Sequence, residues 1–277
     1  MGIEQVDCLV RFVRMCSDGW DQGWHERNGG NLTYRMKESD VEACRPYFNG
    51  TPGEWVDLGV TCTTLAGQYF ITTGSGKYMR NVPVDVADTV GIVEINETGT
   101  AYRIVWGLAG GGKPTSELPS HLMNHEVCAA RTNGANRVIY HAHTPGVIAM
   151  TFVVPLDNRT FTSWLWKMMT ECVVVFPQGV GVVPWMVPGG AAIAKASSEL
   201  MKQFDAVVWA HHGLFASGPD FDTTFGLMHT IEKAAELYLQ ARAANGGSDD
   251  FLNYITDQNL KDTCRDFNVA INEDFVD

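Results

Sequence analysis

The chain has 277 residues, of which 45% are hydrophobic and 19% charged, a balance that is ordinary for a soluble globular protein. A net charge of −12 without any cluster of Lys or Arg argues against nucleic acid or an anionic membrane surface as a partner. No apolar run is long enough for a membrane span, and the N-terminal segment lacks the pattern of a secretory signal. Seven scattered cysteines, an odd number without close pairs, indicate a reducing compartment, so we expect a cytoplasmic protein.

Hydrophobic periodicity predicts elements along the whole chain. The pattern predicts an amphipathic helix over 5–24, an alternating strand after the glycine-rich turn of ERNGGNLTYRM, strands at 68–73, 90–95 and 101–108, and a helix over 119–132. It further predicts a strand before the histidines of VIYHAHTPG, a helix near 161–170, strands at 172–176 and 206–210, and helices over 189–204, 220–244 and near 250–266. Because helices recur between runs of strands, this order predicts one α/β sandwich with a mixed sheet.

Two histidines one residue apart end the apolar run of VIYHAHTPG. The β-branched and aromatic residues at 137–140 predict a buried strand, and alternation places His141 and His143 on the same face of it. Side chains two positions apart on a strand are separated by about 6.6 Å, so two imidazoles there can share one metal ion. The same pattern also fits two polar residues hydrogen-bonded at the end of a strand.

A second histidine pair, His211 and His212, follows the predicted strand 206–210 and precedes a glycine. Zinc in a catalytic site usually has three protein ligands and an open position. One histidine of this pair would complete such a set with His141 and His143, because two strand ends in one sheet can be neighbours.

His121 and His125 form a competing pair, spaced i and i+4 on the predicted helix 119–132. The residue after His121 is Leu, so the general base of the zinc-protease helix is absent. We interpret both histidines as helix-surface residues or as residues that support a site from behind. Glu117 lies just before this helix and could cap it, ligate a metal or act as a general base.

Two glycine-rich turns could bind an anion. TTGSGKYMR fails the Walker A pattern, because Ile71 stands where the first glycine belongs and Tyr78 follows the lysine. What remains is a Gly-Ser-Gly turn whose backbone N–H groups could line an anion nest. RNGGN, at 27–31, offers similar donors and two asparagine amides. No dinucleotide fingerprint follows any strand, so a nicotinamide or flavin enzyme is not expected.

Taken together, these motifs resemble the class II aldolase/adducin family from about residue 20 to 245. The segments that carry the resemblance are GWHERNGGNLT, ITTGSGKYMRNV, GIVEI, PTSELPSH, RVIYHAHTP, TECVVVFPQGVGVVPWMVPG and HHGLFASGPDFDTTFGL. The resemblance implies a single domain over 1–277, a three-layer sandwich with a central, largely antiparallel sheet flanked by helices. The stretch 246–277 matches nothing in the family and is a tail of undefined role.

The resemblance also implies the residues of an active site. It implies one Zn²⁺ per subunit, held by His141, His143 and the histidine that precedes Gly213, which is His212. Glu117 would be the catalytic carboxylate, and Glu171 would be contributed to the site of the adjacent subunit in a ring-like homotetramer. The positions that match the family's phosphate site are Asn28, Asn31, Ser75, Gly76, Thr115 and Ser116.

The block TECVVVFPQGVGVVPWMVPG favours one activity within the family: reversible cleavage of L-rhamnulose 1-phosphate to dihydroxyacetone phosphate and L-lactaldehyde, in L-rhamnose catabolism. Alternatives are an aldolase for fuculose 1-phosphate and a pentulose-phosphate 4-epimerase with the same metal site. A non-enzymatic, adducin-like domain would not need three histidines and a glutamate. A structural zinc site would need a fourth protein ligand, and Cys172 is the only cysteine beside a site residue.

Overall fold

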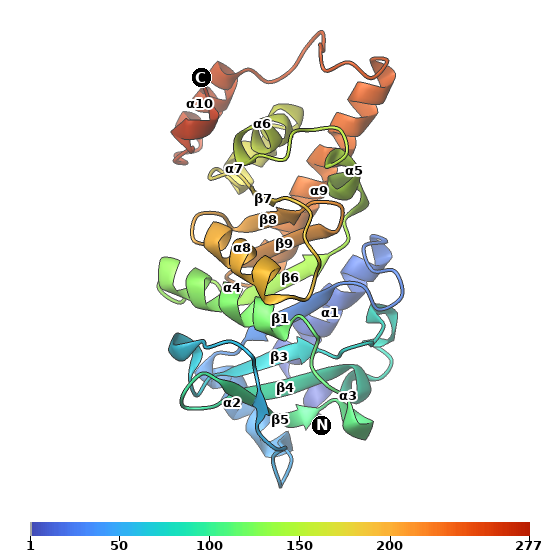
Figure 1. Ribbon diagram of the computed structural model, residues 1–277, viewed down its shortest axis with the longest axis vertical. Helices are drawn as coiled ribbons and strands as arrows, with labels where there is room; N and C mark the ends of the chain where they lie inside the picture. The colour runs from blue at the N-terminus through green and yellow to red at the C-terminus, as the bar shows by residue number, and fades with distance from the viewer. Residues whose placement is uncertain (1) are drawn as a thin grey trace.

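A nine-stranded sheet runs through the computed structural model, which describes residues 2–277 (Figure 1). The strands are β1 (Asn31–Arg35), β2 (Val56–Asp57), β3 (Tyr69–Thr73), β4 (Val90–Ile95), β5 (Ala101–Gly107), β6 (Val138–Ala142), β7 (Gly181–Val183), β8 (Ala206–Trp209) and β9 (Gly213–Gly218). Their order is β2-β5-β4-β3-β1-β6-β9-β8-β7. Only β7 and β8 pair in parallel, so the expectation of a mixed, largely antiparallel sheet is confirmed.

Helices cover both faces of the sheet. They are α1 (Asp7–Asp21), α2 (Glu38–Cys44), α3 (Val86–Thr89), α4 (Leu118–Arg131), α5 (Pro145–Met150), α6 (Asn158–Met168), α7 (Glu171–Val175), α8 (Ala191–Met201), α9 (Phe221–Ala244) and α10 (Asp257–Asp266). Short 3-10 helices span Ile3–Gln5, Arg45–Tyr47, Thr63–Leu65, Met79–Asn81, Ala109–Gly111 and Glu273–Phe275. Helices α4 and α8 pack on one face, whereas α1 and α9 pack on the other (Figure 1), which confirms the three-layer arrangement.

Strand β6 lies near the middle of the sheet and contributes to both layers. Val138 and Tyr140 pack into the core beneath α1 and α9, whereas Ile139 packs into the core beneath α4 and α8. His141 points to the same side as Ile139, where its ring stacks on Phe215 of β9 with a centroid separation of 4.2 Å. The alternation of this strand therefore aims His141 at the α4 side of the sheet, as its sequence predicts.

The predicted strand at 172–176 is wrong, because this segment is helix α7. Cys172, Val173 and Phe176 are buried while Val175 is exposed, which is helical rather than alternating spacing. The Phe176 N–H donates to the Cys172 carbonyl, closing a helical turn. Short β-branched runs are ambiguous between strand and helix, and packing against α6, α9 and α10 decides this one.

Strand β9 follows the histidine doublet and was not predicted, because its sequence, GLFASG, is short and rich in small residues. It pairs with β6 on one side and β8 on the other. His211 turns the chain between β8 and β9 with a positive φ of 61°, a conformation that histidine adopts more readily than most residues. The ends of β6 and β8 are thus brought together by a strand between them.

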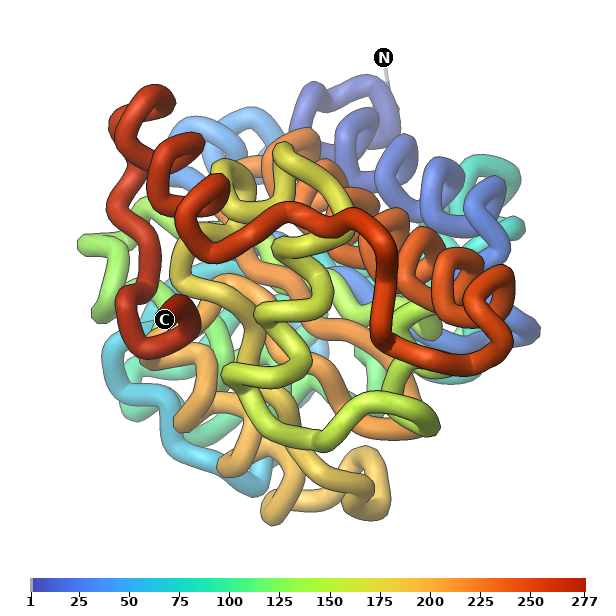
Figure 2. Tube along the Cα trace, turned by 90° about the horizontal axis from the view of Figure 1, so that it is seen from above, coloured from blue at the N-terminus to red at the C-terminus, as the bar shows by residue number. Residues whose placement is uncertain are grey.

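The stretch 246–277 forms α10 and crosses one end of the molecule (Figure 2). Leu260 and Cys264 are buried, and α10 packs on α7. The Asp257 carboxylate is 3.0 Å from the Lys167 ammonium group of α6. The predicted helix near 250–266 therefore exists but begins at Asp257. Over residues 2–277, no helix combines the length and the apolar character needed to cross a bilayer.

Candidate active site

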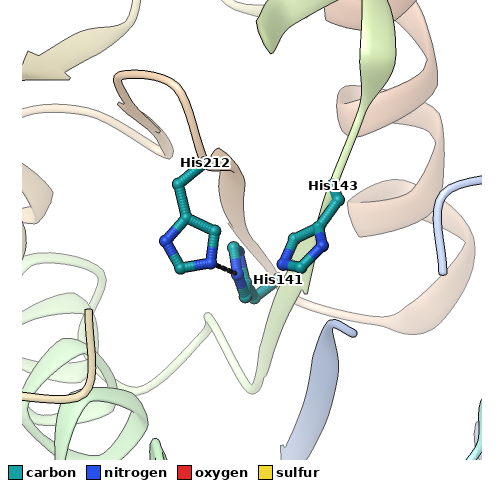
Figure 3. A group of neighbouring side chains, drawn as sticks. All are labelled: His141, His143 and His212. Carbon is teal, nitrogen blue, oxygen red and sulfur yellow. Dashed lines mark hydrogen bonds between the residues drawn. The ribbon is translucent and has the colours of Figure 1, made fainter. Parts of the chain in front are cut away.

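Three histidine side chains converge at one end of the central strands. His141 is on β6, His143 lies just beyond it, and His212 precedes β9. Their ligand atoms all lie within 4.8 Å of one another, and Nε2 of His141 is 3.3 Å from Nε2 of His212. Figure 3 shows the three rings turned toward a common point. Two nitrogen ligands of a tetrahedral zinc ion, each at about 2.1 Å, are about 3.4 Å apart, so this arrangement fits a metal ion.

The hydrogen bonds behind these rings leave the inner nitrogens free to bind a metal. Nδ1 of His141 donates to the Leu214 carbonyl at 3.2 Å, and Nδ1 of His143 donates to a Glu26 carboxylate oxygen at 2.7 Å. A proton on Nδ1 leaves a lone pair on Nε2, which is the pattern of histidines that ligate metals. Burial, followed by the neighbouring imidazoles, holds the pKa of His141 well below its usual value. Burial likewise lowers the pKa of His212 to about 4, so both rings are neutral at pH 7.

The structure distinguishes the two histidines of the doublet. His211 turns away from the cluster, where its ring lies over Phe152 with centroids 4.3 Å apart and its Nδ1 is 3.2 Å from the Thr151 hydroxyl. His212 faces His141 and His143, with ring centroids 4.9 Å from each. The positive φ of His211 turns the backbone so that the two neighbouring side chains point to different sides.

Glu117 stands at the N-terminus of α4, directly before Leu118. Its side chain does not cap the helix; it accepts a hydrogen bond of 2.9 Å from Nδ2 of Asn31. Its Oε2 is 3.9 Å from Nε2 of His141. Burial raises the pKa of Glu117, while the Asn31 hydrogen bond opposes that rise by favouring the ionised form. The site therefore holds a partly desolvated carboxylate beside the three imidazoles.

A cavity of about 290 Å³ opens in front of Glu117 and the histidine cluster. Its lining includes every residue expected from sequence at the metal and phosphate positions: Asn28, Asn31, Ser75, Gly76, Thr115, Ser116, Glu117, His141, His143 and His212. Gly29, Gly30, Gly74, Pro188 and Gly189 complete it. Among the described residues, no Lys or Arg lines this cavity, so an anion there would be held by neutral donors.

The predicted backbone nest at the Gly-Ser-Gly turn needs a correction. The Gly74 N–H donates to the Thr89 carbonyl at 2.8 Å, and the Ser75 N–H donates to the Lys113 carbonyl at 2.8 Å. Lys77 N–H also donates within the turn, to the Gly74 carbonyl. The Gly74, Ser75 and Lys77 N–H groups therefore fix the turn and are not free for a ligand, which leaves the Gly76 N–H as its backbone donor toward the cavity. Besides the Gly76 N–H, side-chain hydroxyl and amide groups are the donors that line this part of the cavity.

The structure decides between the two interpretations of His121 and His125. His121 and His125 are fully buried, so the helix-surface interpretation is wrong, whereas support from behind the site is what their contacts show. His121 Nε2 donates to Oδ1 of Asn31, which in turn contacts Glu117.

Glu171 is exposed at the start of α7. Among the described residues, it does not line the cavity formed by its own chain.

Sequence reasoning missed two residues that shape the site. Glu26 orients the His143 ring, and His25 holds the 27–31 turn. His25 Nδ1 donates to the Gly29 carbonyl at 3.0 Å, and its Nε2 accepts from the Tyr140 hydroxyl at 2.6 Å. Both residues lie in the quoted segment GWHERNGGNLT, but nothing in their spacing marks them as partners of β6.

The chain belongs to the family described as Class II Aldolase and Adducin N-terminal domain, which it matches over residues 10–239. It is 46% identical over 235 residues to the rhamnulose-1-phosphate aldolase of Mannheimia succiniciproducens, a match that covers 85% of this chain and 86% of the relative. Most of each chain is therefore included in the comparison.

Solved structures agree with this family assignment. A sugar-phosphate aldolase from Thermotoga maritima superposes with a TM-score of 0.70 at 27% identity, covering 85% of this chain and 95% of the other. An L-fuculose 1-phosphate aldolase superposes with a TM-score of 0.59 at 18% identity, covering 95% and 96% of the two chains. The second likeness concerns the fold alone.

Proposed function

We propose that this protein is a zinc-dependent aldolase that reversibly cleaves L-rhamnulose 1-phosphate to dihydroxyacetone phosphate and L-lactaldehyde. The observation that carries the proposal is the convergence of three imidazoles, one buried carboxylate and a set of neutral donors on a single cavity. The relative from Mannheimia succiniciproducens supports this substrate over fuculose 1-phosphate, because its similarity extends over most of the chain.

His141, His143 and His212 would hold the metal through their Nε2 atoms. When bound, zinc supplies Lewis-acid stabilisation, worth several kcal/mol, of the negative charge that develops on substrate oxygen atoms. Three protein ligands leave a coordination position open for substrate, as in other catalytic zinc sites. Glu26 holds the His143 ring in its ligating orientation.

Glu117 is the proposed base. In the direction of synthesis it accepts the proton from the carbon of dihydroxyacetone phosphate that attacks the aldehyde, and in cleavage it returns that proton. Its buried position raises its pKa, which strengthens it as a base, and the Asn31 hydrogen bond fixes one of its oxygens. Proton transfer by a positioned group of this kind contributes about 10²- to 10⁴-fold to a rate.

The phosphate group would occupy the end of the cavity lined by Asn28, Ser75, Gly76, Thr115 and Ser116, with Asn31 between it and the base. Hydroxyl and amide donors there can hold a dianion without Lys or Arg. Anchoring the phosphate fixes the reacting carbon relative to Glu117, and such positioning lowers the entropic part of the barrier.

Glu171 has a place in the proposal only through assembly. Its own chain keeps it on the surface, outside the described lining of the cavity. We propose a homotetramer in which Glu171 reaches the aldehyde end of the adjacent subunit's site and assists proton transfer at the reacting hydroxyl. The seven cysteines are free thiols, which fits the reducing cytoplasm as the compartment of this enzyme.

A coupled assay of dihydroxyacetone phosphate release from L-rhamnulose 1-phosphate tests the proposal. We expect release that a chelator abolishes and added zinc restores. With a pentulose phosphate supplied as the substrate instead, formation of its intact 4-epimer without release of fragments would assign the epimerase activity. No release from zinc-loaded protein, with L-fuculose 1-phosphate cleaved in the same assay, would assign the other aldolase.

A further inference from the structure

An unbroken chain of hydrogen bonds leads from the proposed base into the protein interior. Glu117 Oε2 accepts from Nδ2 of Asn31 at 2.9 Å, and Asn31 Oδ1 accepts from Nε2 of His121. The Thr33 hydroxyl lies 2.8 Å from Nδ1 of His121 and 2.8 Å from Nε2 of His125. None of the five residues is more than 8% exposed.

The chain follows from two periodicities that meet face to face. Asn31 and Thr33 are two positions apart on β1, so they project from the same face of that strand. Glu117, His121 and His125 are four positions apart along α4 and its N-terminus, so they line one face of that helix. The β1 and α4 side chains alternate along the hydrogen-bond chain, which we call the β1–α4 relay.

The chemistry of each group fixes the direction in which the relay donates. An ionised carboxylate only accepts, so Asn31 must present Nδ2 to Glu117 and Oδ1 to His121. His121 must then carry its proton on Nε2 and accept the Thr33 hydroxyl proton at Nδ1. The Thr33 oxygen in turn accepts from Nε2–H of His125. Each residue of the relay therefore donates a hydrogen bond to the neighbour that is one step closer to Glu117.

Two observations support a single proton on each imidazole. Burial lowers the pKa of His121 to about 3 and holds the pKa of His125 well below its usual value, so both rings are neutral. Nδ1 of His125 is buried without a partner among the described residues, so nothing there would accept a proton placed on it. The reversed direction would need that proton and would turn Oδ1 of Asn31 against the carboxylate.

We propose that Thr33, His121 and His125 are positioning residues that lock the Asn31 amide with Nδ2 on Glu117, and so hold the base in its reactive orientation. The inference rests on the proposed role of Glu117 in proton transfer. Neither histidine contacts the cavity, so their effect must pass through Asn31. Without the relay, the Asn31 amide has no fixed partner on its far side and can turn its oxygen toward the carboxylate.

Two substitutions of Thr33 separate the relay from packing. Thr33→Val keeps the volume but removes the hydroxyl, whereas Thr33→Ser keeps the hydroxyl but removes a methyl group. The relay predicts that Val lowers kcat by about 10- to 100-fold, as supporting residues of active sites typically do, with little change in KM and with Ser close to wild type. A packing role predicts the opposite order, because Ser leaves a cavity and Val does not.

The control is Thr224→Val, which removes the hydroxyl of an equally buried threonine on α9 that donates to the carbonyl of Asp220, the N-cap residue of that helix. All variants are compared as zinc-loaded protein, below the temperature at which any of them unfolds. Equal kcat for Thr33→Val and the control would overturn the proposal. A larger loss for Thr33→Ser than for Thr33→Val would also overturn it.

A spectroscopic readout makes the test independent of turnover. Long-range ¹H–¹⁵N spectra distinguish the protonated from the bare nitrogen of a histidine ring. We expect His121 with its proton on Nε2 in wild type and in Thr33→Ser, and a shift toward the other tautomer in Thr33→Val. A proton on Nδ1 of His121 in wild type would overturn the relay. Failure of wild type to release dihydroxyacetone phosphate would refute the proposed function, while the tautomer still reports on the relay.

Discussion

Two groups of histidines lie close to Glu117, and each has a spacing that suits zinc. His141, His143 and His212 open onto a cavity, and the partners of the first two occupy Nδ1 and leave Nε2 free. His121 and His125 are fully buried, and Asn31 and Thr33 occupy three of their four ring nitrogens. The comparison teaches that the partner on each nitrogen, rather than the spacing, decides whether a histidine is available to a metal.

The largest expected effect comes from removing one ring of the open group. His141→Ala should lose stoichiometric zinc and at least about 10³-fold in turnover, because several kcal/mol of charge stabilisation is lost with the metal. His121→Gln is the matched variant in the buried group and should retain one zinc per chain. Metal analysis after gel filtration measures both. Zinc loss in His121→Gln and not in His141→Ala would reverse the assignment of the two groups.

The next effect concerns the carboxylate that lies between the groups. Glu117→Gln should keep zinc while kcat falls by about 10²- to 10⁴-fold, since an amide cannot accept the substrate proton. Zinc content and single-turnover rates measure the two properties separately. Near-normal turnover with bound zinc would remove Glu117 from the proposed mechanism.

A pH effect on stability reports on the buried His121 ring in the metal-free protein. The folded pKa of His121, about 3, lies below the unfolded value of about 6.5, so folding favours the neutral ring. The resulting stability is present above pH 6.5 and is lost as the pH falls toward 3. Relative to His121→Gln, wild type should therefore lose about 1.4 kcal/mol per pH unit below pH 6. Urea unfolding at pH 4, 5 and 6 measures this, and a gap that does not change with pH would contradict it.

The smallest effect is expected at the rim of the open group. Glu26→Gln should weaken zinc affinity by about tenfold, because Gln orients the His143 ring less firmly than a carboxylate does. The Glu26 side chain is 66% exposed, which places the effect at the low end of the usual range. Competition with a chelator measures the affinity, with Glu42→Gln, on the exposed side of α2, as the control. Unchanged affinity would contradict the prediction and show that the Glu26 hydrogen bond to His143 does not contribute to zinc binding.

Local patterns predicted much of the fold. The strand at β3 and the long helix α9 differ from their predicted ranges by one residue. Both have clear turn signals at their ends: Gly67 and Gly74 flank β3, and Pro219 and the Asn245-Gly246 pair flank α9. Segments whose structure depends on residues far away in the chain were not predicted correctly. The valine run of α7 is helical only because α6, α9 and α10 cover it, and β9 is a strand because β6 and β8 flank it.

The candidate site shows the same limit. Histidine spacing and the resemblance to a family predicted the residues that line the cavity, since those are marked by type and position. The supporting contacts were not predictable, because they join residues of β1 to residues of α4 that lie about 90 positions away in the chain. Thr33 has no special sequence context, and its importance emerges only when β1 packs against α4.

The register of two central strands has a consequence for how the protein folds. Asn31 on β1 lies directly opposite His141 on β6, although the chain makes a long excursion through β2–β5 and α4 between them. Closing such a loop is slow relative to forming local turns. The three proposed zinc ligands lie on or beside β6 and β9, whereas Asn31 reaches the cavity only when β1 pairs with β6. Recovery of turnover during refolding should therefore lag behind zinc uptake, and this lag times the moment at which the two halves of the sheet join.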